Sequence, residues 1–248
     1  MKLRVLGAHA PYAPHGGACN GYLLETGGMR IMLDCGNGSF AQLQQYCDFR
    51  LLDALIITHY HPDHFHDYHC IRHAIAGSIR DKSRFKPLAV IAPAEGAPYT
   101  EMCEWDGVFA MWPLAEYLQQ PRPLGEVGLF FLENIHTVKS YGCSFTQENT
   151  KIVYTSDTSW HAGLVDFAYE ADLLVCEASV LNKDKQQAVE KGHLTAGEAG
   201  YLASSARVKQ LVLTHLWPQT DPRLLLKEAR ENFDGEITLA GSGLSFLV

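Results

Sequence analysis

Residues 53–64 read Asp-Ala-Leu-Ile-Ile-Thr-His-Tyr-His-Pro-Asp-His and determine how the rest of the chain is interpreted. The apolar, β-branched first half predicts a short buried strand that ends at His59. Four side chains that can bind a metal follow within six residues: His59, His61, Asp63 and His64. His59 and His61 alternate as strand residues do, and the proline favours a new turn that presents the other two ligands further along. A solvated polar loop needs no such density of imidazole, so the stretch predicts that one loop serves two metal ions.

Three later strand-like runs end in the same kinds of side chain. They are Leu132-Glu133-Asn134-Ile135-His136, Val153-Tyr154-Thr155-Ser156-Asp157 and Val212-Leu213-Thr214-His215. Any one alone is typical of a residue that caps a helix or binds the backbone. Together with the first loop, they predict that His136, Asp157 and His215 belong to the same metal site.

The composition is that of an ordinary folded protein. Of 248 residues, 47% are hydrophobic and 19% charged, and the formal net charge is −8, which gives no general attraction to polyanions such as nucleic acid. No run approaches the roughly 18 apolar residues of a membrane span. Seven scattered cysteines never form a CxxC motif, which argues against disulfides and thiolate zinc sites and favours a cytoplasmic location. Without repeats or a linker, residues 1–248 are expected to form a single domain.

The hydrophobic pattern predicts an α+β fold with two sheets packed face to face and helices outside. Residues 2–7, 19–26 and 30–36 are expected to form an antiparallel start. Further strands are expected at 87–92, 126–133, 143–147, 151–157, 172–178 and 210–215, and helices at 39–47, 64–80, 195–206 and 222–232. Residues 93–125 are the least readable stretch, and we treat them as a candidate lid that carries Trp105 and Trp112.

The HxHxDH pattern of His59, His61, Asp63 and His64 resembles the signature of the metallo-β-lactamase superfamily. The resemblance extends to the later ligand positions and therefore covers nearly the whole chain. It implies the αββα four-layer sandwich, with two divalent metal ions as cofactors. One ion would be held by His59, His61 and His136, the other by Asp63, His64 and His215, and Asp157 would bridge them. Imidazole and carboxylate ligands without thiolate suit zinc, manganese or iron, and the spacing does not choose among them; zinc is taken as the first candidate.

Two further motifs resemble the RNase Z-like branch of this superfamily. Asp157 stands where lactam-hydrolysing members with two zinc ions have cysteine, which argues against antibiotic hydrolysis. Cys176-Glu177-Ala178-Ser179 and Gly192-His193-Leu194-Thr195-Ala196 resemble the segments in which a glutamate orients a histidine that faces the substrate phosphate. Leu194 departs from the usual small polar residue. A structural interpretation also fits, because Thr195 and Glu198 have the spacing of a helix capping box.

The tRNA-processing members carry a long basic arm before the histidine loop, and this chain has only about 35 residues between Asp157 and His193. Small phosphodiesters are therefore favoured as substrates over tRNA. We interpret the chain as a phosphodiesterase in which a hydroxide shared by two metal ions attacks phosphorus. Asp63, Glu177 and His193 are the predicted catalytic residues.

Other functions stay open at this point. A thioesterase or lactonase would keep the metals and change the bond that is cleaved. A metal-binding sensor or scaffold would bind the ions without catalysing a reaction, although the complete ligand set argues against this function. An RNA processor would need its clamp from a partner subunit. Members of the resembled branch often form homodimers, and no membrane partner is expected.

A few residues near the motifs invite secondary roles. Asp34, at the end of a strand, matches a buried aspartate that holds a ligand loop in the resembled family. Among the histidines expected on the helix after the motif, His66 is the one expected nearest to the site, while His69 and His73 are expected on the helix surface or the pocket rim. Tyr12 or His15 is a candidate for the pocket wall.

Overall fold

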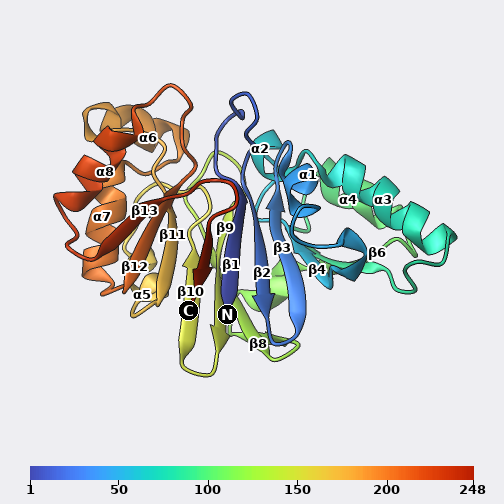
Figure 1. Cartoon of the computed structure of the whole chain (residues 1–248). Coiled ribbons are helices and arrows are strands. Elements are labelled where there is room, and N and C mark those ends of the chain that lie inside the picture. Colours follow the sequence, from blue (N-terminus) through green and yellow to red (C-terminus); the bar gives the residue numbers. More distant parts are fainter.

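Two seven-stranded sheets face each other in the computed structural model, which describes residues 1–248 (Figure 1). The first has the strand order β14-β1-β2-β3-β4-β5-β6 and the second β13-β12-β11-β10-β9-β8-β7. The strands of the first sheet are β1 Lys2–Gly7, β2 Gly21–Thr26, β3 Met29–Cys35, β4 Ala54–Ile56, β5 Leu88–Ala92, β6 Phe109–Pro113 and β14 Ser245–Leu247. Those of the second are β7 Arg122–Leu124, β8 Val127–Glu133, β9 Tyr141–Gln147, β10 Thr150–Tyr154, β11 Leu173–Glu177, β12 Gln210–Thr214 and β13 Glu236–Leu239.

Each sheet is antiparallel in one half and parallel in the other. Strands β1, β2 and β3 pair antiparallel, as the sequence predicts, and β3 through β6 pair parallel. In the second sheet, β7 through β10 pair antiparallel, while β10 through β13 pair parallel. The carboxyl ends of parallel strands meet at one edge of a sheet, so the loops after β4, β10, β11 and β12 come together there.

Helices cover the outer face of each sheet and complete the predicted αββα sandwich (Figure 1). They are α1 Ser39–Leu43, α2 Pro62–Phe65, α3 Tyr68–Arg80 and α4 Ala97–Cys103 on the first sheet, and α5 Gly163–Ala168, α6 Lys185–Lys191, α7 Ala196–Ser205 and α8 Pro222–Arg230 on the second. One apolar cluster lies between the sheets, and two lie between a sheet and its helices. None of these helices has both the length and the apolar character to cross a bilayer.

The packing of α7 on α8 shows why small residues are needed in this outer layer. A Cβ atom on Gly200 would lie 2.2 Å from the backbone oxygen of Ala229, so only glycine allows the two helices to approach this closely. The close approach at Gly200 therefore fixes how α7 and α8 lie against each other.

The structure corrects two predictions about helices and loops. The helix expected at 64–80 is divided into α2 and α3, and the side chain of Asp67 at the break accepts the backbone N–H of Phe40 at 2.9 Å. The lid expected at 93–125 is wrong. Its buried Phe109 and Leu124 belong to edge strands β6 and β7, where they extend the apolar clusters, and Trp105 lies against the guanidinium of Arg72 at 4.9 Å.

Candidate metal centre

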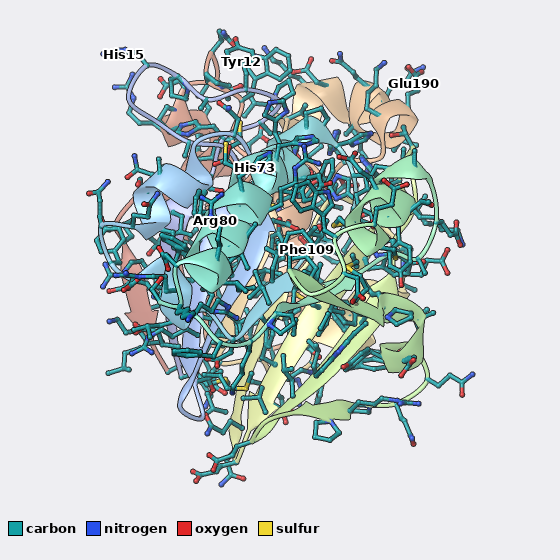
Figure 2. The ribbon with its side chains drawn as sticks, turned by 90° about the vertical axis from the view of Figure 1, so that its right-hand side faces the viewer. Tyr12, His15, His73, Arg80, Phe109 and Glu190 are labelled. Atoms are coloured by element: carbon teal, nitrogen blue, oxygen red, sulfur yellow. The ribbon has the colours of Figure 1, made fainter.

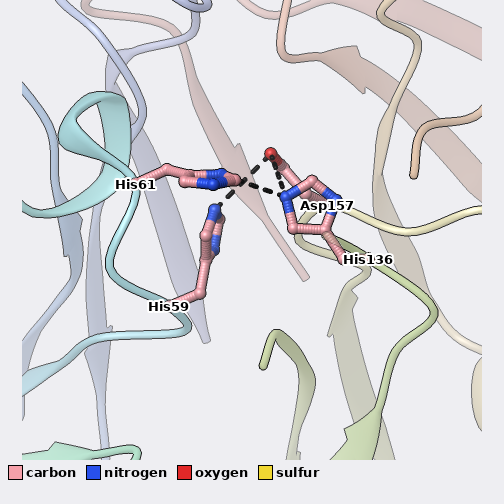
Figure 3. Close-up of side chains that lie close together, drawn as sticks. All are labelled: His59, His61, His136 and Asp157. Carbon is pink, nitrogen blue, oxygen red and sulfur yellow. Dashed lines mark hydrogen bonds and ion pairs between the residues drawn. The ribbon is translucent and has the colours of Figure 1, made fainter. Parts of the chain in front are cut away.

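All the predicted ligands meet at the edge of the sandwich where β4, β8, β10 and β12 end. They form two overlapping groups, His59, His61, His136 and Asp157, and Asp63, His64, Asp157 and His215. Within each group the ligand atoms lie within 4.8 Å of one another. Figure 3 shows the first group, in which the two histidines of the β4 loop face His136 and Asp157 from the opposite sheet. The pairing of the sheets therefore brings together ligands that are far apart in sequence.

Asp157 lies at the centre of this cluster and is only 1% exposed. Its Oδ1 atom is 3.1 Å from the Nε2 atom of His64. Its Oδ2 atom is 3.0, 3.6 and 3.8 Å from the Nε2 atoms of His215, His59 and His136. One carboxylate thus faces four imidazoles and is the only residue common to both groups.

The fold holds the Nδ1 atom of each of these imidazoles, so that Nε2 faces Asp157. The partners of Nδ1 are Asp34 Oδ2 for His64 (2.7 Å), the Gly192 carbonyl for His136 (2.8 Å), Ser179 Oγ for His215 (2.6 Å) and Thr58 Oγ1 for His59 (3.1 Å). Such outer hydrogen bonds fix the orientation of metal-binding histidines in proteins. His61 is arranged differently, because its Nδ1 atom lies 3.0 Å from Nε2 of His136.

Asp34 is the most connected of these supporting residues, and the prediction that it holds the ligand loop is confirmed. Its buried carboxylate accepts hydrogen bonds from the Thr58 N–H at 2.8 Å, the Thr58 hydroxyl at 3.0 Å and the Tyr154 hydroxyl at 3.1 Å, besides that from His64. It joins the β4 loop to β10, which belongs to the other sheet. The site is therefore braced across the whole sandwich.

The backbone is strained at three positions in this region. Asp34, Ser156 and His215 have φ values of 54°, 54° and 59°, in the left-handed region that side chains other than glycine seldom adopt. Each such residue costs about 1–3 kcal/mol and persists only where the surrounding contacts impose it. His215 is a predicted ligand, Ser156 precedes the predicted ligand Asp157, and Asp34 holds the ligand loop. Backbone strain at such positions is typical of a functional site.

Charge and burial show that the cluster fits a metal ion. Burial alone would raise the pKa of Asp157, yet the imidazoles of His215, His64 and His59 hold it well below its usual range. Burial alone would lower the pKa of His215, but the carboxylates of Asp157 and Asp63 raise it to about 10. The buried atoms His59 Nε2, His215 Nε2 and Asp157 Oδ1 have no hydrogen bond of suitable geometry. Unpaired buried imidazole and carboxylate atoms aimed at one point are suited to binding metal ions.

Glu177 and His193 form the predicted pair beside this cluster. Glu177 is fully buried at the end of β11, and its Oε2 atom lies 3.1 Å from Nδ1 of His193. Burial alone would lower the pKa of His193, but the charge of Glu177 and this hydrogen bond raise it above its usual value. The ring of His193 lies 5.2 Å from that of His136 and 5.0 Å from that of His215. Its remaining nitrogen is therefore available to a molecule at the cluster.

The capping box predicted at the start of α7 is present beside the Glu177–His193 contact. The Thr195 hydroxyl accepts the Glu198 N–H at 3.1 Å, and the Glu198 carboxylate accepts the Thr195 N–H at 3.0 Å. Leu194 is completely buried in the apolar cluster beneath α7. The unusual residue at this position thus serves packing.

A pocket of about 530 Å³ opens over the cluster. Sequence reasoning missed the lining residues Pro11, Gln187, Lys191 and Trp217. Trp217 lies two residues after the predicted ligand His215, and this proximity in sequence was the signal that could have identified it. None of His66, His69 and His73 lines the pocket, so their order of approach to the site stays a prediction. The expectation for His15 is wrong, because His15 is exposed and does not line the pocket. Tyr12 is not a lining residue either, although its ring contacts Trp217.

Comparison with known families agrees with this fold and site. Residues 29–216 match a family model described as the beta-lactamase superfamily domain. The chain therefore belongs to the β-lactamase superfamily, and its fold is the metallo-β-lactamase fold.

Particular relatives resemble it over nearly their full length. A protein described as the probable metallo-hydrolase YhfI of Bacillus subtilis is 29% identical, and the alignment covers 98% of both chains. The crystal structure of that protein superposes with a TM-score of 0.94 over 99% of this chain and 98% of that one, at 28% identity. Ribonuclease Z of Clostridium acetobutylicum is 27% identical over 86% of this chain and 87% of its own. The short form of human tRNase Z shares the fold with a TM-score of 0.77 at 23% identity, over 100% of this chain and 99% of that one.

Proposed function

We propose that the protein is a metal-dependent hydrolase of small phosphodiesters. The observation that carries this proposal is the contact between buried Glu177 and His193 beside the ligand cluster. A cationic histidine next to a metal site suits an anionic substrate whose leaving oxygen needs a proton. The similarity to proteins named ribonuclease Z supports a phosphodiester bond over a carbonyl one.

Two divalent ions would be held by the two ligand groups, with zinc the first candidate and manganese or iron the alternatives. His59, His61 and His136 would bind one ion, Asp63, His64 and His215 the other, and Asp157 both. When bound, such ions lower the pKa of a water to about 7 and neutralise phosphoryl oxygens.

Side chains of this chain would orient the substrate and donate the proton. Glu177 orients His193 through Nδ1, which leaves Nε2 to donate a proton to the leaving oxygen or to bind the phosphate. A positioned acid contributes typically 10²- to 10⁴-fold to the rate. Asp63 and Asp157 would keep the second ligand group close to the reacting phosphorus.

The shape of the chain favours small substrates. The residues between Asp157 and His193 form α5, strand β11 of the second sheet, a 3-10 turn (Asn182–Asp184) and α6. No arm extends from this segment to clamp a folded RNA (Figure 1). We therefore expect tRNA precursors to remain uncleaved.

The test is hydrolysis of bis(p-nitrophenyl) phosphate by chelator-stripped protein that has been reloaded separately with Zn²⁺ and with Mn²⁺. A thioester and a lactone are assayed beside it at equal concentration, with a tRNA precursor as a fourth substrate. Metal-dependent release from the diester alone is the expected result. Turnover of the thioester or lactone with an intact diester would replace this proposal by the carbonyl-hydrolase alternative.

A further inference from the structure

The pocket over the ligand cluster has an aromatic wall that the proposed chemistry does not use. Trp217 lines this pocket and is 44% exposed, so its ring is accessible to a molecule in the pocket. Pro11 and Val180 add further apolar surface beside it. The phosphodiester bond would react at the histidines, so this wall can only contact a more distant part of the substrate.

Trp217 is held in place before any ligand binds. The backbone of the preceding residue, Leu216, is hydrogen-bonded on both sides, from its N–H to the Ala8 carbonyl at 2.8 Å and from its carbonyl to the Ala10 N–H at 3.2 Å. The ring of Tyr12 meets that of Trp217 edge-on, with centroids 6.4 Å apart and planes at 70°, and Gln219 donates to the Tyr12 hydroxyl. Preorganised aromatic surfaces bind ligands at low entropic cost.

A cation and an amide lie on another wall of the same pocket. Lys191 and Gln187 reach it from α6, and Lys191 has no carboxylate within 4.0 Å although the chain carries a net charge of −8. Figures 1 and 2 place α6 and the N-terminal loop at the same end of the sandwich, where Glu190 and Tyr12 are labelled. An unpaired ammonium beside a metal cluster suits a phosphate, and an amide can both donate to and accept from a polar ring edge.

The pocket also continues outward past Trp217. A second hollow of about 440 Å³ shares Ser179, Val180, Gln187 and Trp217 with it, and is otherwise lined largely by polar groups such as Lys183, Gln219 and Thr220. A compact dialkyl phosphate would leave this space empty. A substrate with a planar ring and polar edges would fill it.

We propose, on the basis of the phosphodiesterase function above, that the substrate is a nucleoside phosphodiester whose base stacks on Trp217. Its phosphate would lie between the ligand cluster and Lys191, and Gln187 would contact the edge of the base. Trp217 is then the residue that selects nucleosides over other phosphodiesters, and Lys191 contributes to phosphate affinity whatever group is attached.

The test compares two probes that differ only by the base, adenosine 5′-monophosphate and ribose 5-phosphate. Their binding to metal-loaded protein is measured by calorimetry, so that the result does not depend on turnover. Stacking of one base on an aromatic side chain raises the binding affinity by a factor of about ten or more. We therefore expect adenosine 5′-monophosphate to bind at least about tenfold more tightly than ribose 5-phosphate. Trp217→Ala should abolish this preference, Trp217→Phe should retain most of it, and Lys191→Met should weaken both probes equally.

Trp112→Ala is the matched control, because Trp112 is 40% exposed but lies on the edge strand β6, away from the pocket. Equal binding of the two probes to the unmodified protein would overturn the assignment of the base site, as would a preference that survives in Trp217→Ala. Either result would leave the phosphodiesterase proposal standing, since that proposal fails only if bis(p-nitrophenyl) phosphate remains intact.

Discussion

The Oγ atom of Ser179 lies 2.6 Å from the Nδ1 atom of His215. It lies equally close, at 2.6 Å, to the Oε2 atom of Glu177, and because a carboxylate can only accept, the hydroxyl hydrogen points to Glu177. The hydroxyl oxygen must then accept the Nδ1–H of His215, so in the neutral ring the lone pair is on Nε2 and faces Asp157. Glu177 therefore controls the tautomer of His215 as well as the position of His193.

Glu177→Gln should weaken metal binding although it preserves shape and size. The Thr158 N–H donates to Oε1 at 2.6 Å and will keep the amide oxygen on that side, so the amide NH₂ faces Ser179. The hydroxyl must then donate to Nδ1 of His215, which transfers the ring proton to Nε2 where a metal would bind. We expect a loss of roughly 10- to 100-fold in metal affinity, the usual effect of a lost supporting residue. Competition with a chelating dye measures it without an activity assay.

The double variant Glu177→Gln with Ser179→Ala distinguishes this explanation from general damage to the site. It removes the misdirected hydroxyl, so it should bind metal more tightly than Glu177→Gln alone. Ser204→Ala, on the exposed side of α7, serves as the control. Simple additivity of the two losses would contradict the tautomer argument.

His193 should determine the alkaline side of the pH profile of kcat. Glu177 raises the pKa of His193, so the proton-donating form persists above the usual histidine range and kcat falls only as the pH rises through that raised pKa. In Glu177→Gln the charge is lost while burial remains, so the alkaline limb should move to lower pH. His193→Ala should lose about 10²- to 10⁴-fold in kcat with its metal content unchanged, and His66→Ala should lose nothing. An unshifted profile in Glu177→Gln would remove His193 from its assigned role.

The candidate ligand positions could be predicted from the sequence because they lie in short segments that follow strands whose apolar pattern is local. His59, Asp157 and His215 follow β-branched runs that could hardly be anything but buried strands. The link from Glu177 through Ser179 to His215 could not be predicted, because it depends on the parallel register of β11 and β12. The edge strands β6 and β7 were missed for a similar reason, since their short, mixed patterns become strands only against a neighbour. The homodimer and the cytoplasmic location remain predictions.

Gly192→Ala should disturb His136 directly. Gly192 has a φ of 78°, and a Cβ atom there would lie 2.6 Å from Nδ1 of His136, the atom that donates to the Gly192 carbonyl. We expect a loss of metal from the first ligand group together with a lower melting temperature. Gly28→Ala is a close control, because Gly28 has a φ of 74° with nothing within 4 Å. If both variants lost the same stability and neither lost metal, the steric argument would be wrong.

Asp34→Ala should reduce both stability and metal affinity. It leaves the buried N–H and hydroxyl of Thr58 and the Tyr154 hydroxyl without their acceptor, at about 1–3 kcal/mol for each unsatisfied group. It also frees the ring of His64, so metal affinity should fall as well. Denaturant unfolding and dye competition measure the two effects. Asp67→Asn is the control, because Asp67 is another buried carboxylate and its hydrogen bond goes to the Phe40 N–H outside the cluster. The metal affinity of the Asp67→Asn variant should be unchanged. An equal loss of affinity in both variants would show that Asp34 has no specific role.

Removal of the metals should lower the melting temperature, because the ligand groups are assembled only in the folded chain. Binding at a free concentration 100 times Kd adds about 2.7 kcal/mol per site to the free energy of unfolding. At roughly 2–4 °C per kcal/mol for a chain of this size, one site should raise the melting temperature by about 5–10 °C. Asp157→Ala removes the one ligand common to both groups, so added Zn²⁺ should raise its melting temperature by less than in the unmodified protein. Calorimetric unfolding with and without chelator makes the comparison, and an Asp157→Ala protein that gained as much as the unmodified one would show that the ions bind elsewhere.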